Sequence, residues 1–351
     1  MPHKIVGWDI GGAHLKAVLV DNQGAINRVI QTPCPLWKGT DELQSAVVRI
    51  KQEISSDSVL HVLTMTGEMV DYFESREQGV AQILKQMLVS LAAPEVLIFA
   101  GRQGLITPQQ VHSTPYNLIA SANWLASAMY TAQVIPSGIF IDVGSTTTDI
   151  LSIDNYQLNT ASDTDFQRLC SGELIYTGII RTPVMAITDQ VSFQDQQVGI
   201  MAEYFATMAD VYRLTGELHE HNDQLPAADG QKKSVNASAR RLARMIGCDF
   251  ITQQLPAWRQ LAYNIREQQL QKIQQRLIRQ LSNNFIQEPV LIGAGVGRFL
   301  AVELAARQGC QYRDFNSLFD CSITAEAMQV ADCAPAAAIA CLALNQGTAR
   351  N

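Results

Sequence analysis

The chain of 351 residues is long enough for two domains of ordinary size, each with its own hydrophobic core. Its formal net charge of −7 argues against nucleic acid and an anionic membrane as partners, because both attract basic surfaces. No apolar run is long enough to span a bilayer, and no signal-peptide core precedes the first strand. Seven cysteines without a C-x-x-C pair indicate reduced thiols, so we expect a cytoplasmic protein.

A hairpin around a glycine turn is predicted near the N-terminus. Two apolar runs, residues 4–10 and 14–20, are joined by a short segment that contains Gly11 and Gly12. Glycine has no Cβ, so these residues let the backbone approach a phosphate closely. Lys16 lies just past the turn, where it can reach a phosphate as a point charge or remain a solvated strand residue.

Helices and strands alternate through the rest of the first half, as in α/β proteins. Glu68 lies in the polar loop that follows the predicted strand over residues 59–65. This loop is at the carboxyl end of a strand, where α/β proteins tend to bind ligands. Glu68 is therefore a candidate acid or base, with helix capping as the alternative. The elements expected here are a strand near 25–31, a helix over 41–53, a strand over 59–65, a helix over 79–91, a strand over 96–101 and a helix over 117–133.

A second hairpin, over residues 138–154, opens the second half of the chain. Its turn contains Gly144, Ser145, Thr146 and Thr147. Gly144 allows close approach of the backbone, and the three residues after it supply hydroxyls and successive amide donors. These groups suit phosphate oxygens, so this turn is a predicted phosphate site.

Acidic residues border both turns. Asp142 and Asp149 flank the second turn, and Asp9 precedes the first. Carboxylates do not accept a bare phosphate, so we expect a hard cation such as Mg²⁺ between them and the anion. Placing Asp9 over Asp142 aligns the two hairpins without a gap at an offset of 142 − 9 = 133 residues, which indicates a duplicated domain.

The segment 171–184 contains two further candidates. The guanidinium group of Arg181 can donate two parallel hydrogen bonds to a phosphate or carboxylate. Glu173 can bind a cation or accept a proton. A structured loop with an Arg–Glu ion pair is the alternative. Asp210, in a predicted helix over 198–216, is a third candidate base, although it can simply pair with a nearby arginine on the same helix face.

The last part of the chain is expected to contain a helical insertion of about residues 185–288 and then a glycine-rich turn. Gly293, Gly295 and Gly297 follow a predicted strand in the pattern G-x-G-x-G, which differs from a dinucleotide fingerprint. The helices expected in this part are 198–216, 238–247, 251–288, 298–307 and 335–344.

Two acidic glycine hairpins and a late glycine element resemble the phosphate-1, phosphate-2 and adenosine elements of the actin-like ATPase superfamily, which includes acetate and sugar kinases, 70-kDa chaperones and actin. The resemblance implies two ribonuclease-H-like domains with an interdomain cleft, at residues 1–135 and 136–351. It implies that Gly293, Gly295 and Gly297 lie in the adenosine-type element. Whether ATP or ADP binds stays open at this stage.

A more specific resemblance is to hydantoinase/oxoprolinase-related proteins of tetrahydromethanopterin-linked one-carbon metabolism, the methanofuran-biosynthesis synthase family. It implies a Mg²⁺-assisted transferase that joins an aminomethylfuran-methyl diphosphate to a tyramine- or tyrosine-type phenol and releases diphosphate. The motifs that support it are MTGEMVDYF (65–73) with Arg76, NWLASA (123–128), DVGSTTTDI (142–150), SGELIYTGIIRTPV (171–184), EYFATMADVYRLTGEL (203–218), ADG (228–230) and ARRLARMIGCD (239–249).

In this chemistry Asp9, Asp142 and Asp149 would bind Mg²⁺–diphosphate, while Arg181 and Lys16 would orient it. A phenol with a pKa of about 10 needs a base to take its proton. The sequence does not choose among the candidate bases Glu68, Glu173 and Asp210. The partners are small molecules, and the chain is compatible with a homo-oligomer. The rival readings are an ATP-dependent small-molecule kinase or hydantoinase-type ATPase, and an actin-like polymer or chaperone subunit.

Overall fold

The computed structural model describes residues 4–54, 59–160, 162–284, 288–321 and 328–348. Contacts group the chain into two compact units. The first unit consists of Met1–Phe140, Leu151–Cys170 and Arg313–Asn351, and the second of Ile141–Ile150 and Ser171–Tyr312. Because each unit is built from separate stretches, the units do not coincide with the segments 1–135 and 136–351. Each of those segments does, however, contain one of the two large sheets.

The first sheet has six strands in the order β3-β2-β1-β4-β5-β6. β1 pairs with β2 in antiparallel fashion and with β4 in parallel, so the carboxyl ends of β1 and β4 lie at the same edge. The predicted hairpin and the strand over 59–65 are confirmed. The strands are β1 (Lys4–Ile10), β2 (His14–Asp21), β3 (Ile26–Pro33), β4 (Val59–Met65), β5 (Val96–Phe99) and β6 (Leu105–Ile106).

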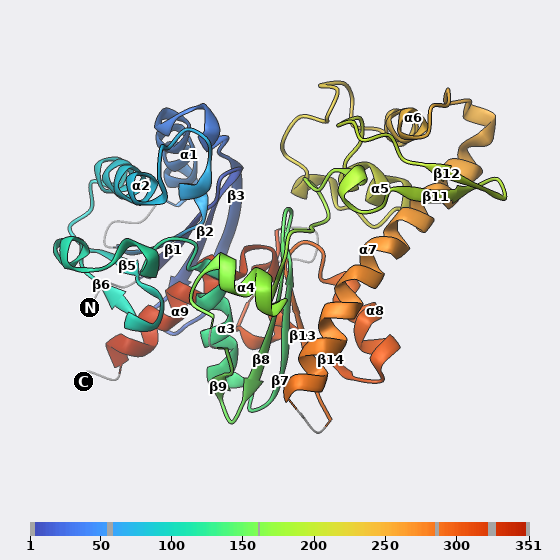
Figure 1. Cartoon of the computed structure of the whole chain (residues 1–351). Coiled ribbons are helices and arrows are strands. Elements are labelled where there is room, and N and C mark those ends of the chain that lie inside the picture. Colours follow the sequence, from blue (N-terminus) through green and yellow to red (C-terminus); the bar gives the residue numbers. More distant parts are fainter. Residues whose placement is uncertain (1–3, 55–58, 161, 285–287, 322–327, 349–351) are drawn as a thin grey trace. The chain divides into compact units, whose positions relative to one another are not determined.

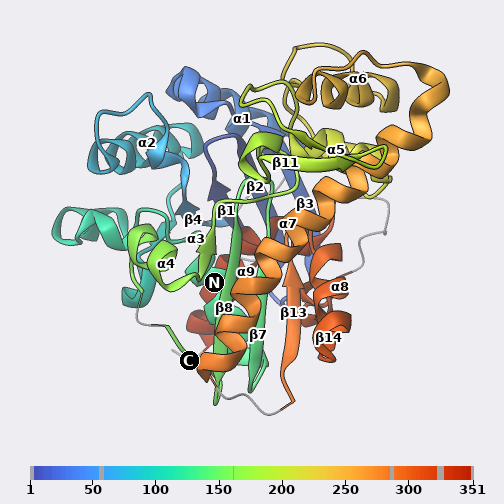
Figure 2. The same cartoon turned by 45° about the vertical axis from the view of Figure 1, so that its right-hand side comes forward.

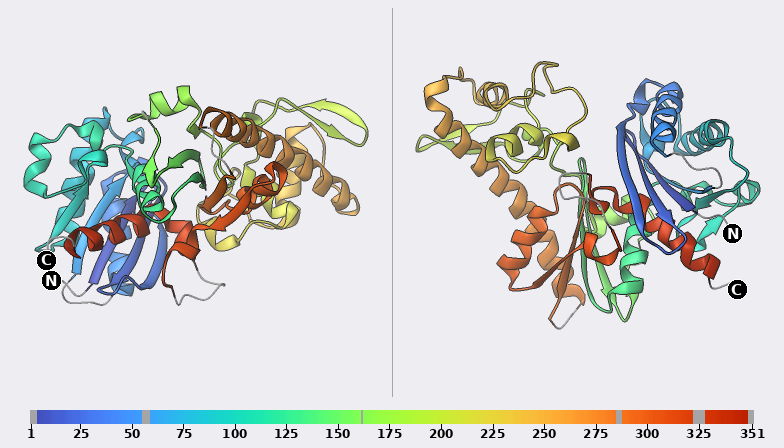
Figure 3. Two further views of the ribbon diagram at one scale, coloured as in Figure 1. Left: turned by 90° about the horizontal axis from the view of Figure 1, so that it is seen from below. Right: turned by 180° about the vertical axis from the view of Figure 1, so that it is seen from behind.

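Helices cover both faces of this sheet (Figures 1 and 3). On the face of Trp8, side chains of α1 (Thr40–Glu53) and α2 (Arg76–Leu91) complete one apolar core with the strands. On the other face, α9 (Ala334–Thr348) lies directly on β1, and a Cβ placed on Gly7 would be 1.9 Å from the Ala336 carbonyl oxygen. Small residues at these positions therefore allow backbone to approach backbone.

One predicted helix begins later than expected. The helix α3 spans Asn123–Val134, whereas the small-residue pattern predicted a start at residue 117. Ser121, just before it, has a φ of 48°, in the left-handed region that interrupts a helix. This turn directs the Ser121 hydroxyl to the carboxylate of Glu68.

The second sheet has the order β10-β8-β7-β13-β14, with β9 on β8. The boundary between the units passes through β7 and β8. The predicted hairpin over 138–154 is confirmed, and β9 is a short strand that pairs with β8. The strands are β7 (Gly138–Val143), β8 (Thr148–Asp154), β9 (Gln157–Leu158), β10 (Leu174–Ile175), β13 (Val290–Ala294) and β14 (Gln311–Asp314).

The insertion of the second unit is mainly helical and also contains a hairpin, β11 (Gln190–Phe193) and β12 (Gln196–Gly199). The prediction of a helix over 198–216 was wrong at its start, because α5 (Met208–Thr215) begins only after Thr207, which caps it together with Asp210. Figure 2 shows the long α7 beside α5 and α6. The remaining helices are α4 (Asp165–Ser171), α6 (Val235–Met245), α7 (Leu255–Asn284) and α8 (Phe299–Gln308). No helix in the described part of the chain is both long and apolar enough to cross a membrane.

Candidate functional site

The two glycine turns have the same internal geometry. In the first, the Gly11 amide donates to the His14 carbonyl at 3.0 Å, and in the second, the Gly144 amide donates to the Thr147 carbonyl at 2.8 Å. The two donor glycines are 144 − 11 = 133 residues apart, and the two acceptor residues are also 147 − 14 = 133 residues apart. The internal repeat read from the sequence is therefore a repeat of backbone structure.

The second turn presents amides on one side and has its carbonyls occupied on the other. The Gly144 carbonyl accepts from Ile179, and the Ser145 carbonyl accepts from Ile180 and Arg181, at 2.9–3.1 Å. Within the described residues, the amides of the turn positions 145–147 have no hydrogen-bond acceptor, and these residues are half-buried. Successive amides without an acceptor form a concavity that binds anions.

The glycine-rich element packs against this turn's entry strand. Gly295 has a φ of +81°, and a Cβ placed there would lie 2.3 Å from Asp142 Oδ1. The Gly297 amide donates to the Val143 carbonyl at 2.8 Å, while a Cβ on Gly293 would be 2.6 Å from the Tyr312 hydroxyl. All three glycines thus permit close packing within the second unit, and their binding of a nucleotide phosphate stays a prediction.

The acidic residues of the two hairpins differ in their surroundings. Asp9 is buried, and burial raises the pKa of its carboxyl, while Lys16 and a hydrogen bond from Asn123 Nδ2 at 3.2 Å oppose this. Lys16 lies opposite Asp9 in the strand register. At the repeat offset, Lys16 corresponds to Asp149, since 149 − 16 = 133. The position that carries a positive charge in the first hairpin therefore carries a negative charge in the second.

Metal binding by the acidic residues of the glycine turns is not tested by a ready-made cluster of ligands. Within the described part of the chain, no three His, Cys, Asp or Glu side chains gather to hold a metal ion. Mg²⁺ is usually held by one or two carboxylates together with phosphate oxygens. Asp142 is half-buried and lies in the strand that leads into the second turn, and the assignment of Asp9, Asp142 and Asp149 as metal ligands stays a prediction.

Glu68 lies in a polar cluster of the first unit. Its Oε1 accepts from Ser121 Oγ at 2.7 Å and from Arg76 Nη2 at 3.0 Å. Its Oε2 is buried without a hydrogen-bond partner among the described residues. Gly79 fixes the backbone, because a Cβ there would be 2.6 Å from the Glu68 carbonyl oxygen. The cluster thus holds one carboxylate oxygen and leaves the other able to accept a proton or a hydrogen bond.

Arg76 is oriented from a second side as well. Its Nη2 lies 3.5 Å from Asp165 Oδ2, and Asp165 is also 3.5 Å from Arg168, which stacks over the Trp124 ring at 4.2 Å. Ser121 and Asp165 were not singled out from the sequence. They are 45 and 89 residues from Arg76, since 121 − 76 = 45 and 165 − 76 = 89, so no local pattern connects them.

Of the other two candidate bases, Asp210 has partners at both carboxylate oxygens and Glu173 at one. Asp210 Oδ1 accepts from Ser238 Oγ at 2.7 Å and from Arg241 Nε at 2.8 Å, and its Oδ2 accepts the Thr207 amide at 3.2 Å. Buried Asp210 is therefore accounted for by a structural role. Glu173 Oε2 accepts from Ser171 Oγ at 3.0 Å.

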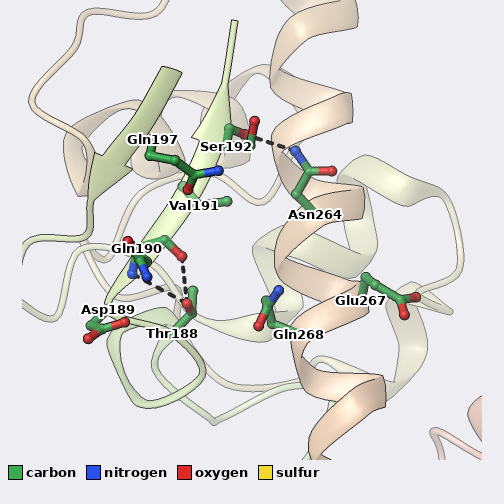
Figure 4. Close-up of a pocket in the computed structure, with 9 residues that line it drawn as sticks. All are labelled: Thr188, Asp189, Gln190, Val191, Ser192, Gln197, Asn264, Glu267 and Gln268. Carbon is green, nitrogen blue, oxygen red and sulfur yellow. Dashed lines mark hydrogen bonds between the residues drawn. The ribbon is translucent and has the colours of Figure 1, made fainter. Parts of the chain in front are cut away.

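A polar cavity of about 360 Å³ lies between β11 and α7 (Figure 4). Thr188 Oγ1 donates to the Gln190 carbonyl at 2.6 Å, and Asn264 Nδ2 donates to the Ser192 carbonyl at 2.8 Å. None of the residues predicted from the sequence as site residues lines this cavity. Its lining consists of Thr188, Asp189, Gln190, Val191, Ser192, Gln197, Asn264, Glu267 and Gln268.

Two sheets that each begin with an acidic glycine hairpin form an α/β fold that the chain shares with solved structures. The nucleotide-free structure of an acetone carboxylase matches with a TM-score of 0.57 at 10% identity, over 98% of this chain and 70% of that one. A ROK family glucokinase from Streptomyces griseus matches with a TM-score of 0.47 at 13% identity, over 97% and 98% of the two chains.

Within this fold, the chain belongs to the hydantoinase/oxoprolinase family, whose model matches residues 60–336. It is 30% identical over 247 residues to the (4-{4-[2-(γ-L-glutamylamino)ethyl]phenoxymethyl}furan-2-yl)methanamine synthase of Methanocaldococcus jannaschii. That match covers 70% of this chain and 72% of the relative. The resemblance to the methanofuran-biosynthesis synthases is thereby confirmed.

Proposed function

We propose that this protein is a transferase of methanofuran-type cofactor biosynthesis. It joins an aminomethylfuran-methyl diphosphate to the hydroxyl of a tyramine- or tyrosine-type phenol and releases diphosphate. The observation that supports this most is the similarity to the archaeal synthase, whose product name describes a phenoxymethyl link between a phenol and a furan. The contacts around the second glycine turn and around Glu68 match the two tasks of that reaction.

The first task is to bind the leaving group. The amides of Ser145, Thr146 and Thr147, which lack acceptors among the described residues, would donate to diphosphate oxygens. Arg181 and Lys16 would add positive charge and fix its orientation. Asp142 and Asp149, together with Asp9, are the proposed Mg²⁺ ligands, and Mg²⁺ when bound would neutralise negative charge on the leaving diphosphate.

The second task is to take the proton of the phenol. The phenol oxygen forms a bond to the furan methylene carbon, the bond from that carbon to the diphosphate oxygen breaks with its electron pair, and the phenol proton goes to a base. Among the three candidate acids, Glu68 fits best, because its Oε2 is buried and has no partner among the described residues. Ser121 and Arg76 would hold the Glu68 carboxylate at its other oxygen.

An assay of diphosphate release from the furan diphosphate tests this proposal, with tyrosine, tyramine and γ-glutamyltyramine each offered as acceptor. We expect Mg²⁺-dependent release with at least one acceptor and a product of the corresponding ether mass. Asp142→Asn and Asp149→Asn should each reduce turnover at limiting Mg²⁺. Wild-type turnover of both variants under that condition would contradict the assignment of the metal ligands.

The competing function is that of an ATP-dependent kinase or hydantoinase-type ATPase. The glycine-rich element after β13, next to Asp142, is the feature that favours it, because an adenosine-type element occupies this place in the superfamily. The discriminating measurement is ADP release from MgATP in the presence of each acceptor. ADP release without diphosphate release from the furan donor would support the competitor over the synthase.

A further inference from the structure

A buried glutamine of the long helix α7 contacts the segment that covers the second glycine turn. Gln269 is completely buried, whereas its neighbour Gln268 is exposed. The Nε2 atom of Gln269 donates to Thr177 Oγ1 at 2.7 Å and to the Gly178 carbonyl at 2.9 Å. Both amide hydrogens of this side chain are thus used on two adjacent residues.

The amide oxygen of Gln269 is held by a second helix. The Tyr212 hydroxyl, on α5, donates to Gln269 Oε1 at 2.5 Å. Tyr212 is fully buried, and burial raises the pKa of its hydroxyl well above the ordinary value of 10.0, so the hydroxyl stays protonated and donates. The Gly178 carbonyl fixes the orientation of the Gln269 amide, because a carbonyl only accepts and the flipped amide would direct its oxygen at another acceptor. The bond from Tyr212 then holds the amide oxygen on the other side.

The two residues that Gln269 holds contact the turn itself. The Thr177 carbonyl accepts from Thr148 Oγ1 at 2.7 Å, at the exit of the turn. A Cβ placed on Gly178 would be 2.4 Å from the Ser145 carbonyl carbon and 2.4 Å from the Thr146 nitrogen. Backbone therefore lies directly on backbone, and a shift of Gly178 displaces the peptide between Ser145 and Thr146.

We propose that Gln269, fixed by Tyr212, is a positioning residue that keeps the turn Gly144–Thr147 in its anion-binding shape. This inference rests on the proposed function, in which that turn binds diphosphate. The residues after Gly178 occupy the carbonyls of Gly144 and Ser145, which leaves the amides of the turn for the anion. Without the Gln269 bonds, the covering segment and the turn move together, and the amides no longer converge.

The test compares Gln269→Met with Gln268→Met, its exposed neighbour on the same helix. The probe is inorganic diphosphate with Mg²⁺, whose binding to the full chain is measured by calorimetry. We expect Gln269→Met to bind diphosphate about tenfold more weakly than wild type, with Gln268→Met unchanged. A second variant, Tyr212→Phe, keeps the ring and removes only the hydroxyl, so it should weaken binding in the same direction by a smaller factor.

A second measurement separates this inference from the proposed function. Hydrogen exchange of the peptide 142–150, recorded without ligand, should be faster at the turn amides in Gln269→Met than in Gln268→Met. Faster exchange in Gln269→Met, together with a wild-type protein that does not bind diphosphate, would keep the positioning role and overturn the diphosphate function. Unchanged exchange and unchanged diphosphate affinity in folded Gln269→Met would overturn the inference.

Discussion

Replacing Glu68 by glutamine tests the proposed base directly. Glutamine has almost the same shape, and its amide oxygen can still accept from Ser121 Oγ, which now lies 2.7 Å from Oε1. The variant lacks only the negative charge and the ability to accept a proton at the buried Oε2 position. Loss of a general base reduces turnover by roughly 10²- to 10⁴-fold. At about 1.36 kcal/mol for each factor of ten, this is roughly 2.7–5.4 kcal/mol of transition-state free energy.

The folded state should lose much less than the transition state. The ion pair from Arg76 to Glu68 spans 3.0 Å, and the Arg76 side chain is 33% exposed, so the solvent already weakens it. Arg76 also keeps Asp165 at 3.5 Å as a second partner. We therefore expect a change of about 1 kcal/mol or less in the free energy of unfolding.

The assay is diphosphate release at saturating donor and acceptor, together with a thermal melt of each variant. Glu74→Gln is the matched control, because Glu74 is an exposed acid in the segment that follows Glu68. It should leave both turnover and melting temperature unchanged. Turnover of Glu68→Gln within a factor of three of wild type would refute the role of Glu68 as base.

Three further predictions concern charged residues at and away from the turns. Asp9→Asn should raise the melting temperature at pH 7 while reducing turnover, because burial raises the pKa of Asp9 and the ionised form therefore opposes folding. Asp210→Ala should lower the free energy of unfolding by about 3–5 kcal/mol, measured in urea, because it leaves buried Arg241 without its closest carboxylate. For Glu267, the hydrogen bond from Arg307 lowers the pKa below 4.5, so its contribution to stability is present above pH 4.5 and is lost as the pH falls through the lowered pKa. Glu267→Gln should flatten the fall of the melting temperature over that acidic range.

Two of these predictions have a control variant. Asp21→Asn, in the first hairpin, should lower the melting temperature, because Asp21 Oδ1 accepts the amides of Gln23 and Ala25 at 2.9 Å. Glu53→Gln replaces an exposed acid on α1 and should leave the acid limb of the melting profile unchanged. A lower melting temperature for Asp9→Asn, or an unfolding free energy of Asp210→Ala within about 1 kcal/mol of wild type, would contradict the electrostatic reasoning.

The sequence was most informative where structure is local. Both hairpins follow from short apolar runs around glycine, and the gapless alignment of Asp9 with Asp142 predicted a repeat that the backbone bonds of Gly11 and Gly144 reproduce. The late start of α3 was missed, because the interruption depends on the left-handed conformation of Ser121 and not on a proline or glycine. A contact with Glu68, 53 residues away, holds that conformation in place.

Partners distant in the chain occupy an oxygen of Asp210 that a base would need. Asp210 looked like a base because it is acidic and lies on a helix, and only the fold brings Ser238 and Arg241 to it. Gln269 lies in the predicted helix over 251–288 and was not singled out, and its hydrogen bond to Thr177 spans 269 − 177 = 92 residues. Such pairings depend on how whole elements pack, which no local pattern records.

The contact between Gly7 and Ala336 also affects how the protein is made. These two residues are 336 − 7 = 329 positions apart, so one face of the N-terminal sheet has no cover until nearly all of the chain has left the ribosome. At a synthesis rate of about 5–20 residues per second, that delay is roughly 15–70 s. During this time an apolar face of the nascent strands stays exposed, so a fragment that lacks the last helix should aggregate instead of folding.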